Sequence, residues 1–103
     1  MLPDLAQQAI ERALKGNWNE ALSLNREIVL ANPKDCEALN RVARAYLELG
    51  RTADAKTYYK RVLRIDPYNT IAQKALERLG NINKFVPYGI KRVKKQKNRQ
   101  SPL

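Results

Sequence analysis

The side chains that could perform catalysis are few in this chain of 103 residues, and their spacing does not favour it. The sequence has one cysteine, Cys36, and no histidine, so a thiol nucleophile would lack an imidazole base and a cysteine–histidine zinc site cannot form. A single cysteine cannot close an internal disulfide. The four glycines are isolated and the carboxylates are scattered, which leaves no phosphate-binding loop and no acid/base pair. We therefore expect no enzymatic activity and no cofactor or metal.

Basic side chains could instead neutralise phosphates. The net charge is +10, and residues 84–103 hold seven Lys/Arg without an acid, which leaves +3 for residues 1–83. Tyr88 and Phe85 could stack on unpaired bases. This composition predicts either contact with RNA, a ribosome or another polyanion, or a solubilising tail or localisation signal without a dedicated partner. The candidate contacts are Lys91, Arg92, Lys94, Lys95, Lys97 and Arg99.

The rest of the chain has the apolar spacing of three and four residues that is typical of helices. It predicts five helices, over about residues 3–15, 19–31, 35–49, 52–65 and 69–79. We expect Asn19, Asp35 and Thr52 to cap the second, third and fourth helices. Glycine, alanine and proline recur after 34 residues, in the pairs Gly16 and Gly50, Ala21 and Ala55, and Pro33 and Pro67. Such a period indicates an array of helical units.

The segment 36–69 resembles a tetratricopeptide repeat, a helix hairpin with large, small and aromatic residues at fixed positions. The matching residues are Leu39, Ala43, Tyr46, Gly50, Ala55 and Pro67. The resemblance implies an all-α fold, a right-handed stack of antiparallel helix hairpins (an α-solenoid). We expect a helical domain over 1–80, with repeats at about 3–35 and 36–69 and a capping helix at 70–79. An apolar linker, 81–90, and a basic, disordered tail, 91–103, would follow.

The register of the first hairpin leaves a choice. Strict spacing would bury Gln8 and Arg12, whereas a turn one residue shorter before Gly16 would bury apolar residues instead. We therefore predict the shorter turn. The residues that it turns inward are Leu5, Ala6, Ala9, Ile10 and Ala13.

In this family, the first helices of successive hairpins line a concave groove that binds a peptide. Carried over by position, the groove residues are Gln7, Glu11, Leu14, Asn40, Arg44, Leu47, Ile71, Lys74 and Arg78. Arg44, Lys74 and Arg78 make one half positive, which favours an acidic segment or a free carboxylate. The alternative is that these are ordinary solvated charges.

One subclass, the co-chaperones that hold acidic chaperone C-termini, uses Lys, Asn and Arg at five positions. The sequence has Gln7, Glu11, Arg41, Ile71 and Ala75 there, so we do not expect that clamp.

Residues 81–90 carry Phe85, Val86, Tyr88 and Ile90. These side chains would fold over the last helix or occupy the groove of the same or a neighbouring molecule, which allows a monomer or a weak homodimer. We expect Trp18, Tyr58 and Tyr59 to pack in the core.

The N-terminus lacks a leader pattern and no apolar run could span a bilayer, which predicts a cytoplasmic, soluble protein without membrane contact. The sequence thus predicts a protein-interaction scaffold or adaptor. A nucleic-acid- or ribosome-associated protein is the alternative.

Overall fold

The computed structural model describes residues 4–80 and shows five α-helices with no strand in that range. They are α1 (Leu5–Leu14), α2 (Trp18–Ala31), α3 (Cys36–Glu48), α4 (Thr52–Ile65) and α5 (Thr70–Arg78). The prediction of an all-α fold is confirmed, whereas the handedness of the stack stays a prediction. The expected linker and basic tail lie outside the described residues.

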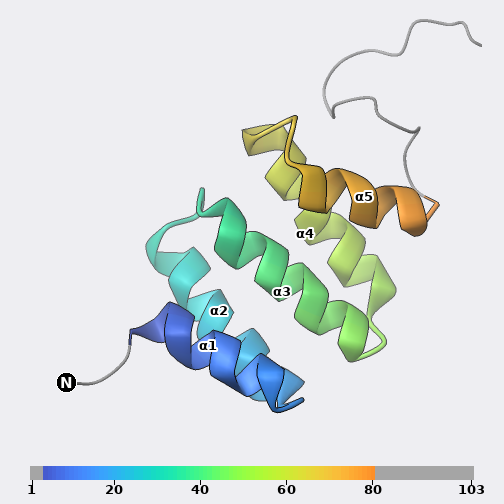
Figure 1. Cartoon of the computed structure of the whole chain (residues 1–103). Helices are drawn as coiled ribbons and strands as arrows, with labels where there is room; N and C mark the ends of the chain where they lie inside the picture. Colours follow the sequence, from blue (N-terminus) through green and yellow to red (C-terminus); the bar gives the residue numbers. More distant parts are fainter. Residues whose placement is uncertain (1–3, 81–103) are drawn as a thin grey trace, which may run out of the picture.

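Consecutive helices run antiparallel and pack side by side, so α1 and α2 form one hairpin, α3 and α4 a second, and α5 closes the series (Figure 1). The core lies where α2, α3, α4 and α5 meet. Leu39, Leu63 and Leu76 are fully buried there. Burying a side chain of this size contributes about 1.5–3 kcal/mol, so this shared core stabilises the packing of the second hairpin with its neighbours.

Three helices begin at a side chain that accepts a hydrogen bond from the backbone. Asp4, Asp35 and Asn69 each accept from the N–H three residues further on, at 2.8, 3.0 and 3.0 Å. These bonds satisfy amide groups that have no partner inside the helix. The expected cap at Asp35 is confirmed.

The expected caps at Asn19 and Thr52 are wrong. The helices α2 and α4 begin at Trp18 and Thr52, and the residues before them, Asn17 and Arg51, form no side-chain cap bond. Instead, the backbone N–H groups of Asn17 and Arg51 each donate to a carbonyl of the preceding helix at 2.8 Å.

The two hairpin turns have the same length, so the expected shorter turn before Gly16 is wrong. Three residues separate α1 from α2 and three separate α3 from α4. Gly16 and Gly50 adopt φ of 79° and 81°, a region that favours glycine. Asn17 N–H donates to Arg12 as Arg51 N–H donates to Tyr46. The 34-residue register therefore extends through the first hairpin.

This register leaves α1 only partly buried. Ala9 lies at the position of Ala43 in α3, and both are fully buried. In contrast, Leu5 and Ile10, which the sequence places inside, are 36% and 43% exposed. Since α1 is the first described helix and packs mainly on α2, a polar residue on its other faces stays in contact with water. Arg12 lies at the position of Tyr46, yet its side chain is 37% exposed and its Nε donates to Glu20 Oε1 of α2 at 2.9 Å.

Candidate functional site

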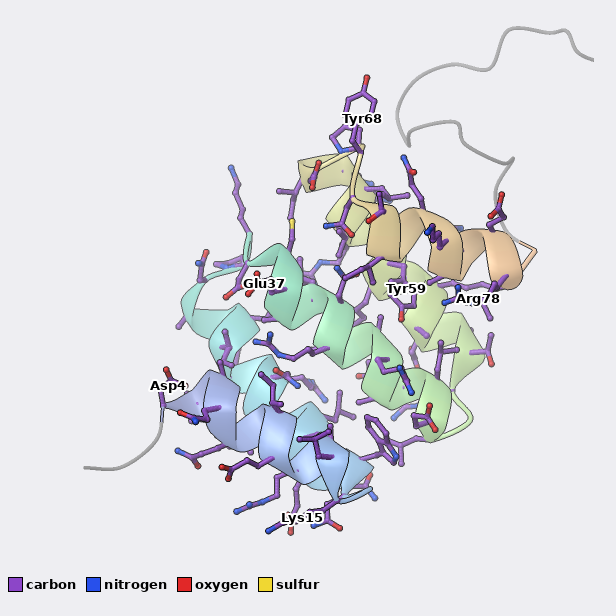
Figure 2. All side chains as sticks on the ribbon, in the orientation of Figure 1. Asp4, Lys15, Glu37, Tyr59, Tyr68 and Arg78 are labelled. Carbon is purple, nitrogen blue, oxygen red and sulfur yellow. The ribbon has the colours of Figure 1, made fainter. Side chains whose placement is uncertain are left out.

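A hollow of about 600 Å³ lies between α3 and α5, and we call it the α3–α5 hollow. Its walls come mainly from these two helices, and Tyr59 of α4 contributes to its lining. It brings together five of the nine expected groove residues, namely Asn40, Arg44, Leu47, Ile71 and Arg78. The side chains on Figure 2 show Tyr59 and Arg78 on the same side of the molecule.

The α3–α5 hollow is positively charged. Arg41, Arg44 and Arg78 line it together with one acid, Glu37. Arg44 Nε donates to Glu48 Oε2 at 2.9 Å, so its charge is partly balanced. Among residues 4–80, Arg41 and Arg78 form no ion pair. Two guanidinium charges are thus available to an anionic ligand.

The positive charges around the α3–α5 hollow also act on Tyr59, which lines it. Its side chain is 3% exposed, and burial raises the pKa of the phenol. The charges of Arg44 and Arg78 act in the opposite direction and lower the pKa of Tyr59. Arginines from α3 and α5 therefore converge on one point, although they lie 34 residues apart in the sequence.

Asn40 connects the two walls. It is 7% exposed, and its Nδ2 donates to Asn69 Oδ1 at 3.2 Å. The same Asn69 oxygen caps α5 by accepting from the N–H of Ala72. Asn40 Oδ1 has no hydrogen-bond partner within the described chain. Asn40 thus fixes the spacing of α3 and α5 as well as lining the hollow.

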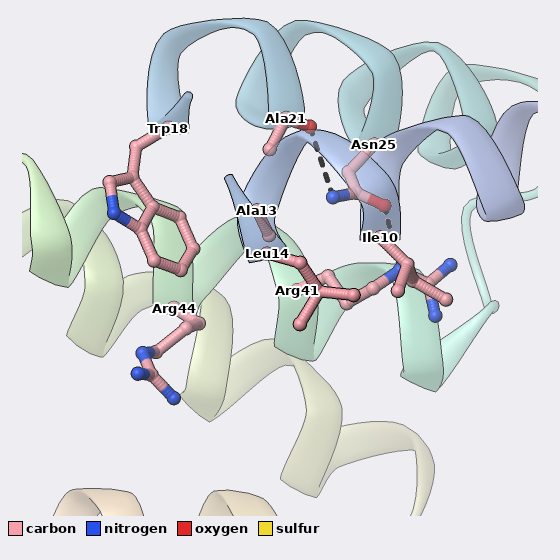
Figure 3. A pocket seen from close by; sticks show the side chains of 8 residues that line it. All are labelled: Ile10, Ala13, Leu14, Trp18, Ala21, Asn25, Arg41 and Arg44. Atoms are coloured by element: carbon pink, nitrogen blue, oxygen red, sulfur yellow. Dashed lines mark hydrogen bonds between the residues drawn. The ribbon is translucent and has the colours of Figure 1, made fainter. Parts of the chain in front are cut away.

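A second hollow, of about 360 Å³, lies between α1 and α3, and we call it the α1–α3 hollow (Figure 3). Its lining is mostly apolar, and the Trp18 ring forms one side of it. Arg41 and Arg44 line this hollow too, so the two hollows adjoin along α3. The full lining is Ile10, Ala13, Leu14, Trp18, Ala21, Asn25, Arg41 and Arg44.

Three expected groove residues lie apart from both hollows. Gln7, Glu11 and Lys74 are exposed and line neither of them. Glu11 of α1 is displaced by the register, because the 34-residue spacing places Ile10, and not Glu11, at the position of Arg44. Leu14 does line the α1–α3 hollow. The six expected polyanion contacts, from Lys91 to Arg99, lie outside the described residues.

Several lining residues were not among the expected site residues. Tyr59 is a core residue, as predicted, and Trp18 is half-buried against the core, yet each also lines a hollow. Asn25 is 1% exposed, and its Oδ1 accepts a hydrogen bond from Arg41 Nε at 2.8 Å. The sequence does contain a signal that could have identified Asn25, because this polar residue lies within the apolar face of its helix.

The described part of the chain contains no group of three potential metal ligands. None of its helices has the length and apolarity that crossing a membrane requires.

The comparison with known proteins gives one match. The family model for the tetratricopeptide repeat matches residues 36–69, which are the residues of α3, α4 and the turns beside them. No curated protein and no solved structure matches the chain. The structure of this segment, an antiparallel helix hairpin with a glycine turn, agrees with the match. The protein therefore carries a tetratricopeptide repeat, formed by α3 and α4.

Proposed function

We propose that this protein is an interaction module that binds an acidic segment of a partner protein in the α3–α5 hollow. Tetratricopeptide repeats generally mediate binding between proteins. The observation that supports an acidic partner is the charge of the hollow, where three arginines face one glutamate. Arg41 and Arg78 have no acidic partner among the described residues, so they can bind a carboxylate without breaking an ion pair.

Guanidinium groups suit this role because their planar donors can form two parallel hydrogen bonds to one carboxylate. Leu47 and Ile71 supply apolar surface beside the arginines, and Ile71 is 61% exposed. The aliphatic part of a glutamate side chain can pack there. Because the arginines face solvent, we expect the affinity to fall as the salt concentration rises.

The test compares two charge reversals that change the net charge equally. Arg78→Glu places an acid in the hollow, whereas Arg26→Glu changes an exposed arginine of α2 that lines neither hollow. Binding of a fluorescently labelled glutamate-rich peptide would be measured by fluorescence polarisation. We expect Arg78→Glu to weaken binding about tenfold or more and Arg26→Glu to weaken it less than about threefold. Equal losses would show that only the overall charge matters and would contradict the proposal.

A second candidate function is binding of RNA or another polyanion through the basic tail. The described part offers one supporting feature, since α4 carries four basic residues after Asp54 and no further acid. Two of them, Lys56 and Lys60, form no ion pair within residues 4–80. Removal of residues 91–103 should then strongly weaken salt-sensitive binding of single-stranded RNA in a filter-binding assay, because the tail holds six of the basic residues. Undiminished RNA binding by the shortened chain would contradict a role for the tail.

A further inference from the structure

We propose that the partner segment also inserts one bulky apolar side chain into the α1–α3 hollow. The segment would then carry two features, a leucine-like residue for this hollow and acidic residues for the α3–α5 hollow. This inference rests on the proposed function, because it concerns the same ligand, and it adds a specificity that charge alone does not provide.

The first argument is that two exposed apolar side chains of α1 line this hollow. Leu14 is 82% exposed and Ile10 is 43% exposed, although both line a hollow. In the 34-residue register, the positions of Ile10 and Leu14 on α3 are occupied by the charged residues Arg44 and Glu48. The helix hairpin therefore folds with polar side chains at these positions. Packing of α1 on α2 does not account for the apolar choice, whereas an apolar ligand group would.

The second argument is that the shared wall is held in place before any ligand arrives. Arg41 is fixed by Asn25 at 2.8 Å. Arg44 is bonded to Glu48 at 2.9 Å, and its guanidinium lies over the Trp18 ring, 5.6 Å from the centroid. Side chains that are already ordered lose less conformational entropy on binding. The walls of the α1–α3 hollow are thus suited to a defined side chain.

The third argument is the order of apolar and charged side chains across the two adjoining hollows. A segment that crosses α1, α3 and α5 meets apolar side chains first, then Arg41 and Arg44, and then Arg78. An apolar residue at the first end of the segment would contact Ile10, Leu14 and Trp18, while its acidic residues reach the arginines. A wholly acidic segment would leave these apolar side chains without an apolar partner.

The experiment uses the full chain and its own fluorescence. Trp18 is the only tryptophan in the sequence and lines the α1–α3 hollow, so its emission reports on that hollow. The probes are pairs of synthetic glutamate-containing peptides that differ by one leucine or serine, in a series that varies the distance between this residue and the glutamates. At one distance, the leucine peptide should bind about tenfold more tightly than its serine partner and shift the Trp18 emission to the blue.

Two matched variants locate the effect. Leu14→Ser changes a leucine that is 82% exposed, and Leu30→Ser changes one that is 83% exposed but lines neither hollow. Both should keep the helical circular dichroism signal, because both side chains lie in water. We expect the advantage of the leucine peptide to disappear in Leu14→Ser and to persist in Leu30→Ser.

The outcomes separate this inference from the proposed function. If the serine peptides bind in an Arg78-dependent way and leucine adds nothing at any distance, the inference is overturned and the proposed function stands. An advantage of leucine that persists in Leu14→Ser also overturns it. If no acidic peptide binds, both the inference and the proposed function are overturned.

Discussion

Two arginines on α3 donate the same kind of hydrogen bond in different surroundings, and their energies can be compared directly. Arg41 Nε donates to the amide oxygen of Asn25 at 2.8 Å. Arg44 Nε donates to a carboxylate oxygen of Glu48 at 2.9 Å. A ranking by formal charge would make the second pair the stronger one. We predict the reverse, because Asn25 is buried and the second pair is not.

The magnitudes follow from burial. Asn25 is 1% exposed, and a hydrogen bond from a charged donor contributes about 1.5–3 kcal/mol when its partner cannot return to water. The side chains of Arg44 and Glu48 are 60% and 38% exposed. Water screens such a pair, and exposed pairs four residues apart on a helix contribute about 0.3–0.5 kcal/mol. The coupling between Arg41 and Asn25 should therefore be several times larger.

Two double-mutant cycles test this prediction, one with Arg41→Ala and Asn25→Ala and the other with Arg44→Ala and Glu48→Ala. The free energy of unfolding of each single and double variant would be measured by urea denaturation. High salt should reduce the coupling of the exposed pair and leave the other nearly unchanged. A larger coupling for Arg44 and Glu48, or one below about 0.5 kcal/mol for Arg41 and Asn25, would refute the reasoning.

Three further predictions concern single positions. Leu63→Ala should reduce the free energy of unfolding by about 2–5 kcal/mol because Leu63 is fully buried, whereas Leu30→Ala should change it by less than about 0.5 kcal/mol; similar urea midpoints would contradict this. Gly50→Ala should reduce the free energy of unfolding by about 1–2 kcal/mol, because φ is +81°. An added Cβ would meet no atom within 4 Å, so the cost comes from the backbone conformation alone. An unchanged urea midpoint would contradict this. Burial, with smaller contributions from Asp66 and Asp35, raises the pKa of the Cys36 thiol, so iodoacetamide should label it more slowly than free cysteine at mildly alkaline pH. Faster labelling than free cysteine would contradict this. Since the folded state holds the thiol proton more tightly than the unfolded chain, the contribution of Cys36 to stability should decline as pH rises through the folded pKa.

The second hairpin could be predicted from the sequence because its signals agree with one another. Apolar residues at helical spacing, Asp35 as a cap, and Gly50 in the turn all indicate the same two helices. The caps at Asn19 and Thr52 were wrong for a physical reason. Residue type identifies amino acids that suit a helix start, but in these turns the first helical residue is set by the backbone bonds of Asn17 and Arg51.

The register of α1 could not be predicted from its apolar residues alone. The sequence allows a pattern that buries Ile10 instead of Gln8, and burial energy favours that pattern. The turn at Gly16 decides otherwise, because its three residues repeat the hydrogen bonds of the turn at Gly50. A helix with a neighbour mainly on one side loses little by leaving Ile10 partly in water.

Positions in the repeat predict part of the lining of the α3–α5 hollow, and a role of these residues in binding stays a prediction. Asn40, Arg44 and Arg78 are expected from their positions in the repeat, and in the structure they line one hollow. Trp18 and Asn25 were missed because each has two roles. Trp18 packs on the core and lines a hollow, and Asn25 is buried while it positions Arg41. Sequence patterns assign a residue to one environment at a time.

The end of α5 repeats the ends of α1 and α3. Gly80 N–H donates to Glu77 at 3.0 Å and adopts φ of 73°, as Gly16 and Gly50 do in the two hairpin turns. In both of those turns this geometry redirects the backbone into an antiparallel helix. For protein engineering, Gly80 is thus a suitable junction at which a helix taken from the first or second hairpin could be grafted to lengthen the array by half a unit.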